Sequence, residues 1–170
     1  GSEMCIRDRY YAARIAKEKY PDAKIVFVGP CVAKRKEAQR DEAVDFVMTF
    51  EEVSSIFDAF EVNLEIVQPY AMEFSSVREA HGFAQAGGVM GAVKAFLKME
   101  ADKINAIQVS DLNKKNIGTL RAYAKSGKAP GQFIEVMACE GGCITGPSTH
   151  SGSNGKRQLV QELAKQEKTY

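Results

Sequence analysis

The sequence has only two histidines among 170 residues, and its charges nearly cancel to a formal net charge of +1 at pH 7. The histidines, His81 and His150, are too few for a metal centre built mainly from imidazole ligands. A balanced charge offers no broad basic field for nucleic acid. No apolar run approaches the roughly 18–20 residues that a membrane-spanning helix needs. Neither nucleic acid nor membrane is therefore expected as a partner.

The composition is that of an ordinary globular protein, because 45% of the residues are hydrophobic and 26% are charged. A domain of this length buries about two thirds of its unfolded surface and needs no disulfides to hold a core. The four cysteines are also too sparse for a secreted disulfide scaffold. We therefore expect a cytoplasmic protein whose cysteines are either buried thiols or metal ligands.

The first residues are interpreted apart from the rest. Gly1-Ser2 is typical of a tag scar, and Met4–Arg9 is typical of translated sequencing-adapter read-through. An ordinary native terminus is the alternative. On the first interpretation residues 1–9 are an artefactual leader, and Cys5 within it has no chemical role. An α/β lobe is then expected over residues 10–147, and a flexible loop and C-terminal helix over residues 148–170.

Apolar runs and helical periodicities alternate along the chain. Helices are expected at Tyr10–Tyr20, Val53–Phe60, Gly88–Met99, Asn113–Ser126 and Lys156–Gln166. Strands are expected at Lys24–Gly29, Val44–Met48, Ala106–Val109 and Phe133–Met137, with Leu64–Val67 as a further candidate. Thr49 and Glu52 have capping-box spacing, and Asp111 and Gly127 are expected to bound one helix. The pattern predicts an α/β fold, a single lobe with a mainly parallel sheet of about four strands flanked by helices.

Cysteines follow the first and the last of these strands. Cys31 comes just after Lys24–Gly29, and Cys139 and Cys143 come just after Phe133–Met137. Because ligands bind at the carboxyl ends of parallel strands, we expect the three thiols to converge, with the Cα atoms of Cys31 and Cys139 about 10 Å apart. Without a cluster, the later loop is expected to be mobile or closed by a disulfide.

The glycines between the later cysteines favour a cofactor. Gly141 and Gly142 lack side chains that would keep backbone N–H groups away from cluster sulfides. Thiolates without paired histidines favour an iron–sulfur cluster over zinc. The alternative is that each cysteine is a small buried apolar residue.

Two other features have both a plain and a functional interpretation. Lys34 and Glu37 are either solvated surface charges or groups that serve an anionic cofactor near Cys31. Gly87-Gly88 opens a helix and allows either an anion at the helix N-terminus or tight packing.

Four segments together resemble iron-only (FeFe) hydrogenases. Gly29–Ala38 is similar to the family's Pro-Cys-Thr-Ala-Lys-Lys-x-Glu-Ala motif, and Phe133–Ile144 is similar to its Met-Ala-Cys-Pro-Gly-Gly-Cys-Ile segment. Val44–Glu52 and Gly87–Met90 resemble two further motifs, in the family's order. The resemblance implies two α/β lobes around an H-cluster, which joins a 4Fe–4S cubane to a two-iron subsite carrying carbonyl and cyanide.

The resemblance also implies roles for individual residues. Cys31 and Cys139 would bind the cubane, and Cys143 would bridge it to the two-iron subsite. Lys34 would donate to a cyanide, Met137 would pack near the subsite, and Glu37 would be the outer carboxylate of a proton path. The expected partners are a ferredoxin-like electron carrier and an N-terminal part of the same protein.

This sequence also departs from the family. The earlier motif that supplies the remaining cubane cysteine is not found, and Glu140 stands where the family has proline. The first hypothesis is therefore a C-terminal portion of a hydrogenase (H2 = 2 H+ + 2 e−), inactive and free of the cluster as an isolated fragment. The second is a sensory or electron-transfer iron–sulfur relative without rapid turnover. The third is an α/β binding domain with buried cysteines. Whether the chain itself is an enzyme stays open.

Overall fold

The computed structural model describes residues 8–40, 43–68, 70 and 77–166. The chain forms two compact units. The first comprises Gly1–Val67 and Pro147–His150, and the second comprises Gln68–Gly146 and Ser151–Tyr170. Each is described below by itself.

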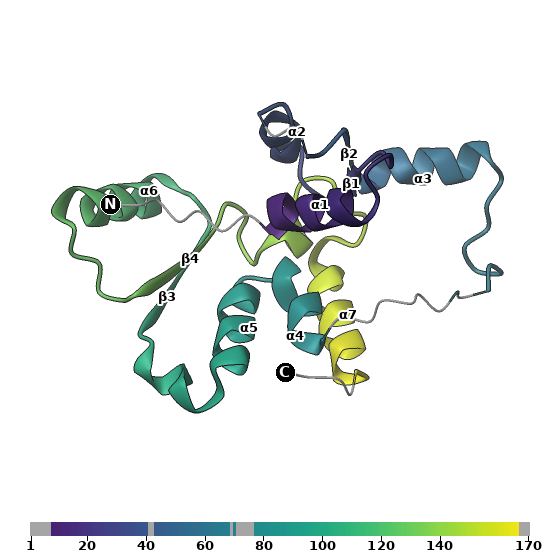
Figure 1. Cartoon of the computed structure of the whole chain (residues 1–170). Coiled ribbons are helices and arrows are strands. Elements are labelled where there is room, and N and C mark those ends of the chain that lie inside the picture. Colours follow the sequence, from purple (N-terminus) through teal and green to yellow (C-terminus); the bar gives the residue numbers. More distant parts are fainter. Residues whose placement is uncertain (1–7, 41–42, 69, 71–76, 167–170) are drawn as a thin grey trace. The chain divides into compact units, whose positions relative to one another are not determined.

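The first unit is built around a short parallel sheet. Its elements are α1 (Asp8–Lys19), β1 (Val26–Val28), α2 (Ala33–Ala38), β2 (Phe46–Met48) and α3 (Phe50–Ala59) (Figure 1). β1 and β2 pair in parallel, with Val26 opposite Phe46 and Val28 opposite Met48. The helix α2 forms the crossover, as parallel pairing requires.

The predicted capping box at the start of α3 is confirmed. The Thr49 hydroxyl accepts the Glu52 N–H at 3.3 Å, and the Glu52 carboxylate accepts the Thr49 N–H at 2.8 Å. This backbone hydrogen bond, followed by the contact with Arg35, lowers the pKa of Glu52. The reciprocal bonds fix where β2 ends and α3 begins.

Asp45 fixes the other end of β2. Its carboxylate accepts the Ile25 N–H at 2.8 Å and the Lys24 ammonium at 3.0 Å, and Lys17 lies 3.4 Å away. The backbone hydrogen bond, followed by the bond from Lys24, lowers the pKa of Asp45 from 3.8 to about 2. The ionised carboxylate thus joins the starts of the two strands to α1.

This lowered pKa predicts a loss of stability in acid. Because the folded chain holds Asp45 ionised, its contribution is complete above about pH 4 and disappears as the pH falls through 2. Urea unfolding of the wild-type chain should therefore show a falling free energy of unfolding over this range. Asp45→Asn should show a shallower fall, and equal slopes for the two proteins would contradict the assignment.

The second unit contains the longer parallel sheet. Its elements are α4 (Arg78–His81), η1 (Gly82–Ala84), α5 (Gly88–Leu97), η2 (Lys98–Lys103), β3 (Ala106–Ser110), α6 (Lys114–Ser126), β4 (Phe133–Met137), η3 (Cys143–Thr145) and α7 (Gly152–Ala164). β3 and β4 pair in parallel over five residues each, from Ala106 opposite Phe133 to Ser110 opposite Met137. α6 connects them (Figure 1).

The predicted α/β class with parallel strands is confirmed, but the single sheet is not. The four strands of the described residues form two separate two-stranded sheets, β1–β2 and β3–β4. Val26 and Val28 of β1 are 45% and 42% exposed. Both strands of a two-stranded sheet are edge strands, so each lacks a neighbouring strand on one side.

Three local predictions are also corrected. Leu64–Val67 forms a turn, because the Asn63 side chain accepts the Glu65 N–H at 2.9 Å and holds the chain away from an extended path. Asn113, rather than Asp111, caps α6 by accepting the Asn116 N–H at 2.9 Å. α7 begins at Gly152, so the last residues of the expected loop are helical.

Few large apolar side chains are buried in the described residues. The buried hydrophobic residues are the small or branched Ala13, Val44 and Ala92. No helix in the same residues is long and apolar enough to cross a membrane.

Candidate functional site

The loop after β4 contains two of the predicted ligands. Cys139 and Cys143 are both half-buried. The Gly142 N–H donates to the Cys139 carbonyl at 3.1 Å, and the Gly146 N–H donates to the Cys143 carbonyl at 2.9 Å. These two turns fold the chain back on itself around the cysteine pair.

Side-chain hydroxyls hold both halves of this loop. The Ser110 hydroxyl, at the end of β3, accepts the Gly141 N–H at 3.0 Å and donates to the Cys139 carbonyl at 3.4 Å. The Thr145 hydroxyl donates to the Gly142 carbonyl at 2.9 Å and also to the Glu140 carbonyl. Sequence reasoning missed Ser110, although a polar residue ending an apolar strand was the available signal.

Gly141 and Gly142 both have left-handed backbone angles, with φ of 78° and 102°. A Cβ on Gly142 would lie 2.4 Å from the Ala86 nitrogen and 2.7 Å from the Ala84 oxygen. The Ala86 N–H also donates to the Gly141 carbonyl at 3.0 Å. Gly142 is therefore required because the backbone before α5 packs directly against it.

Glu135, in the middle of β4, was not predicted as a functional residue. Glu135 is only 5% exposed. One of its carboxylate oxygens accepts the Gly87 N–H and the other accepts the Met90 N–H, each at 2.7 Å. The anion that the Gly87-Gly88 pair was expected to allow is thus a carboxylate of the protein itself. A carboxylate inside an otherwise apolar strand was the signal that could have revealed it.

Met137 ends β4 two residues before Cys139. It is half-buried and lies opposite Ser110 in the sheet register. Its predicted role beside a two-iron subsite stays a prediction.

Cys31 lies in the first unit, in the turn between β1 and α2, and is half-buried. The Lys34 N–H donates to its carbonyl at 3.3 Å, which begins α2 directly after the cysteine. The neighbouring Pro30 carbonyl accepts the Ser148 N–H at 3.4 Å within the same unit. Cys31 thus lies at a turn held by one local bond, from Lys34, and by one bond from a distant segment, at Ser148.

Lys34 and Glu37 form one charged group at this turn. The Lys34 ammonium contacts both carboxylate oxygens of Glu37 at 2.8 Å. The Arg9 guanidinium, whose side chain is 5% exposed, lies 3.6 Å from the same carboxylate. Glu37 thus binds two cations, Lys34 and Arg9, close to Cys31 in the sequence or in the fold of the first unit.

The structure does not test the convergence of all three thiols. Cys139 and Cys143 belong to the second unit and Cys31 to the first. In the part of the chain that is described, no group of three or more Cys, His, Asp or Glu side chains could hold a metal ion. The expected common sheet is wrong, because β1 pairs with β2 and β4 with β3. Of the two expected states of the later loop, the one closed by a disulfide is not found, since Cys31, Cys139 and Cys143 carry thiols in this described region.

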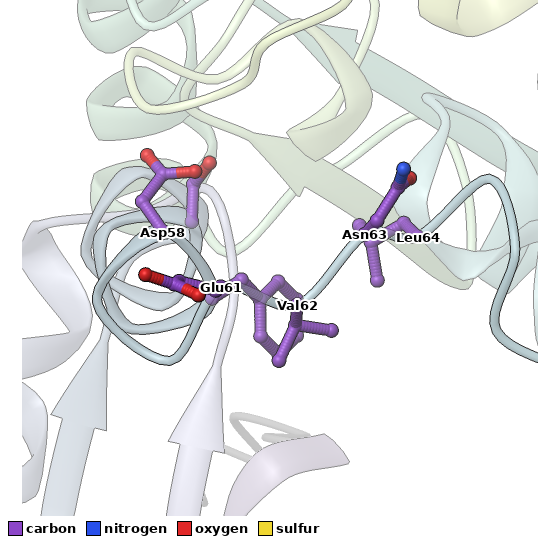
Figure 2. A pocket seen from close by; sticks show the side chains of 7 residues that line it. Asp58, Glu61, Val62, Asn63 and Leu64 are labelled. Carbon is purple, nitrogen blue, oxygen red and sulfur yellow. The ribbon is translucent and has the colours of Figure 1, made fainter.

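A shallow pocket of about 440 Å³ lies elsewhere in the first unit, at the end of α3. Figure 2 shows the side chains around it, including Asp58, Glu61 and Asn63. None of the predicted site residues lines this pocket.

Comparison with protein families matches residues 5–147 to the iron only hydrogenase large subunit, C-terminal domain. The chain belongs to this family. The resemblance suggested by the four motifs is thus confirmed at the level of the family.

Curated relatives of this hydrogenase-family chain carry names outside hydrogen metabolism. A nuclear prelamin A recognition factor of Danio rerio is 27% identical over 81% of this chain and 39% of its own length. A cytosolic Fe-S cluster assembly factor of the same species is 28% identical over 84% of this chain and 46% of its own length. The chain therefore spans less than half of each of these relatives.

Solved structures of FeFe-hydrogenases share the fold of this family member. One, concerning stepwise H-cluster assembly, aligns with a TM-score of 0.57 at 20% identity, over 92% of this chain and 58% of that chain. Another, concerning oxygen inactivation, aligns with a TM-score of 0.62 at 19% identity, over 95% of this chain and 58% of that chain. At such identities the likeness shows the fold alone.

The donor set suits an iron–sulfur cluster in kind. Thiolates are the usual ligands of these clusters, and a four-iron cluster commonly takes four. The cysteine pair flanks two glycines. Gly142 packs against the backbone of Ala84 and Ala86, and a Cβ on Gly141 would meet the Thr145 side chain. Cys31 carries a thiol of the same kind in the first unit. The thiols are therefore of the kind that an iron–sulfur cluster takes.

Proposed function

We propose that this chain is an iron–sulfur protein of the hydrogenase-like family, which binds a cluster and serves electron transfer or cluster assembly rather than rapid hydrogen turnover. The observation that carries the proposal is the loop of Cys139 and Cys143. The hydroxyls of Ser110 and Thr145 hold the backbone of this loop by hydrogen bonds. Preformed thiol pairs bind metal more tightly, because less order is imposed on binding.

Cys139 and Cys143 would hold the cluster, and Cys31 would provide a third thiolate. A cluster held there would supply one-electron transfer.

The protein residues around the thiols would tune this site. Arg9 and Lys34 both lie beside Glu37, and their positive charges would stabilise an anionic cluster bound near Cys31. The N–H groups of Gly141 and Gly142 donate to the Ser110 hydroxyl and the Cys139 carbonyl, so they are engaged within the loop. The nearby cations would favour the reduced, more negative state of a cluster.

The name of one relative, a cytosolic Fe-S cluster assembly factor, supports cluster assembly over hydrogen turnover. We extend this to a cytoplasmic location and to a ferredoxin-like electron carrier as partner. The remainder of a longer protein, or a separate chain, would provide the further cluster ligand.

Hydrogen turnover is the second candidate, favoured by the Lys34–Glu37 pair that begins one turn after Cys31. In that case a complete H-cluster would use Cys143 as the bridging thiolate and would place Lys34 and Met137 beside the two-iron subsite. Glu37 would then serve the proton path. Hydrogen evolution with reduced viologen, measured on the longer natural protein after maturation, distinguishes this candidate from the first.

Anaerobic reconstitution of the purified chain with ferrous iron, sulfide and excess dithiothreitol, whose thiolate can fill the remaining ligand position, tests the main proposal. We expect iron and acid-labile sulfide to be retained in equal amounts after desalting, with the broad visible absorption of a cluster. A chain that retains neither above the level of a cysteine-free control would overturn the proposal. Mononuclear iron without sulfide would also overturn it.

A further inference from the structure

We propose that Glu135 is a positioning residue for the Cys139–Cys143 loop. Its buried carboxylate fixes the turn formed by residues 84–88, and this turn holds Gly141 and Gly142 between the two cysteines. The inference rests on the proposed cluster-binding function, because the geometry of the cysteine pair matters for that function.

The carboxylate of Glu135 accepts two backbone hydrogen bonds at the start of α5. Each oxygen accepts one backbone N–H, from Gly87 and from Met90, at 2.7 Å. Both donors lie in or just before the first turn of a ten-residue helix, where the helix dipole and unpaired N–H groups stabilise negative charge. Bonds of this kind are about twice as strong as those between neutral groups.

The turn held by Glu135 is tightly constrained. Gly87 has a left-handed φ of 89°, and a Cβ on Gly88 would lie 1.9 Å from the Gly82 oxygen. The Gly88 N–H also donates to the Gln85 carbonyl at 3.0 Å. A shift of the helix start would therefore move the backbone of this turn as a whole.

The same turn contacts the cysteine loop directly. The Ala86 N–H donates to the Gly141 carbonyl at 3.0 Å, and the missing side chain of Gly142 leaves room for Ala84 and Ala86. Glu135 also lies on β4, four residues before Cys139. Glu135 on β4 thus binds the start of α5, and the turn before α5 in turn binds the cysteine loop that follows β4.

A variant that keeps the shape of Glu135 isolates the effect of its charge. In Glu135→Gln the side chain keeps one oxygen that can accept a hydrogen bond. Its NH2 group replaces the other oxygen and faces one of the two backbone N–H donors in a buried site. Asp45→Asn is the matched control, because Asp45 also accepts a backbone N–H but lies in the first unit. Glu135→Asp retains the charge with a shorter reach and serves if Glu135→Gln does not fold.

The readout is the binding of phenylarsine oxide, whose arsenic bonds two thiols with release of water. The full chain carries Cys5→Ser and Cys31→Ser, so that only Cys139 and Cys143 can bind the reagent. We expect Glu135→Gln to weaken binding about 10-fold, the lower end of the effect of residues that orient ligands. Alkylation of single thiols by iodoacetamide should be unchanged, and Glu135→Asp should restore part of the affinity.

The outcomes separate positioning from general stability. Glu135→Gln and Asp45→Asn are compared at an equal loss of free energy of unfolding in urea. A lower arsenic affinity in Glu135→Gln but not in Asp45→Asn supports the inference. Unchanged affinity in both Glu135 variants overturns it. Because the arsenic assay needs no cluster, a wild-type chain that binds arsenic but not iron and sulfide would overturn the proposed function alone.

Discussion

Gly142→Ala should make the second unit unfold far more easily than it does in the wild-type chain. The new Cβ would lie 2.4 Å from the Ala86 nitrogen and 2.7 Å from both the Ala84 oxygen and the Gln85 carbonyl carbon. All three are backbone atoms, so no flexible side chain can move aside. The φ of 102° adds strain for any residue with a side chain.

Together these effects should lower the free energy of unfolding by about 2–4 kcal/mol. Urea unfolding followed by circular dichroism measures this difference. The arsenic affinity of the cysteine pair should fall as well, because the loop can relieve the clash only by moving away from the turn.

Gly91→Ala is the matched control for this substitution. Gly91 lies inside α5, has no atom within 4 Å of its ideal Cβ, and belongs to the same unit. Alanine there should raise the free energy of unfolding by about 0.5–1 kcal/mol, because alanine favours the helix. If Gly142→Ala were as stable as Gly91→Ala, the close packing of the loop against the turn would be contradicted.

Local sequence signals predicted much of this structure. The capping box of Thr49 and Glu52, the left-handed Gly127 at the end of α6, and strand β4 are all confirmed. Each depends on a few neighbouring residues, whose side chains and backbone angles decide the local structure. The family was likewise visible in four motifs, since the match covers residues 5–147.

Strand pairing could not be predicted in the same way. The apolar runs of β1 and β4 identify strands, but nothing within them indicates which strand is the neighbour. The structure pairs β1 with β2 and β3 with β4, so each strand pairs with the nearest strand along the chain. A single sheet would also require pairing between one of β1 and β2 and one of β3 and β4. Strands as short as these carry too little pattern to specify such pairing.

The candidate site shows the same division between local and distant information. The cysteines and glycines of the loop were found because they are adjacent in sequence. Glu135 was missed because its partners, Gly87 and Met90, are more than forty residues earlier in the chain. A buried carboxylate on β4 needs hydrogen-bond donors, and only the folded structure shows that the start of α5 provides them.

Replacement of either late cysteine should abolish the cluster. Cys139→Ser and Cys143→Ser each remove a soft thiolate and leave a hydroxyl, which is a poor ligand for iron in such clusters. We expect retained iron and sulfide to fall at least about 10-fold in each variant, because even residues that only orient ligands have effects of this size. Iron and acid-labile sulfide are measured after anaerobic reconstitution and desalting.

Cys31→Ser and Cys5→Ser complete this series and test how many thiolates take part. Cys31→Ser should weaken retention as strongly as the late variants, since the proposed site needs it as a third ligand. Cys5→Ser should have no effect, because the leader is expected to have no chemical role. Full retention in Cys31→Ser would place the cluster on Cys139 and Cys143 without the first unit and would contradict the three-thiolate site. Loss in Cys5→Ser would instead identify Cys5 as a ligand and would contradict the interpretation of residues 1–9 as an inert leader.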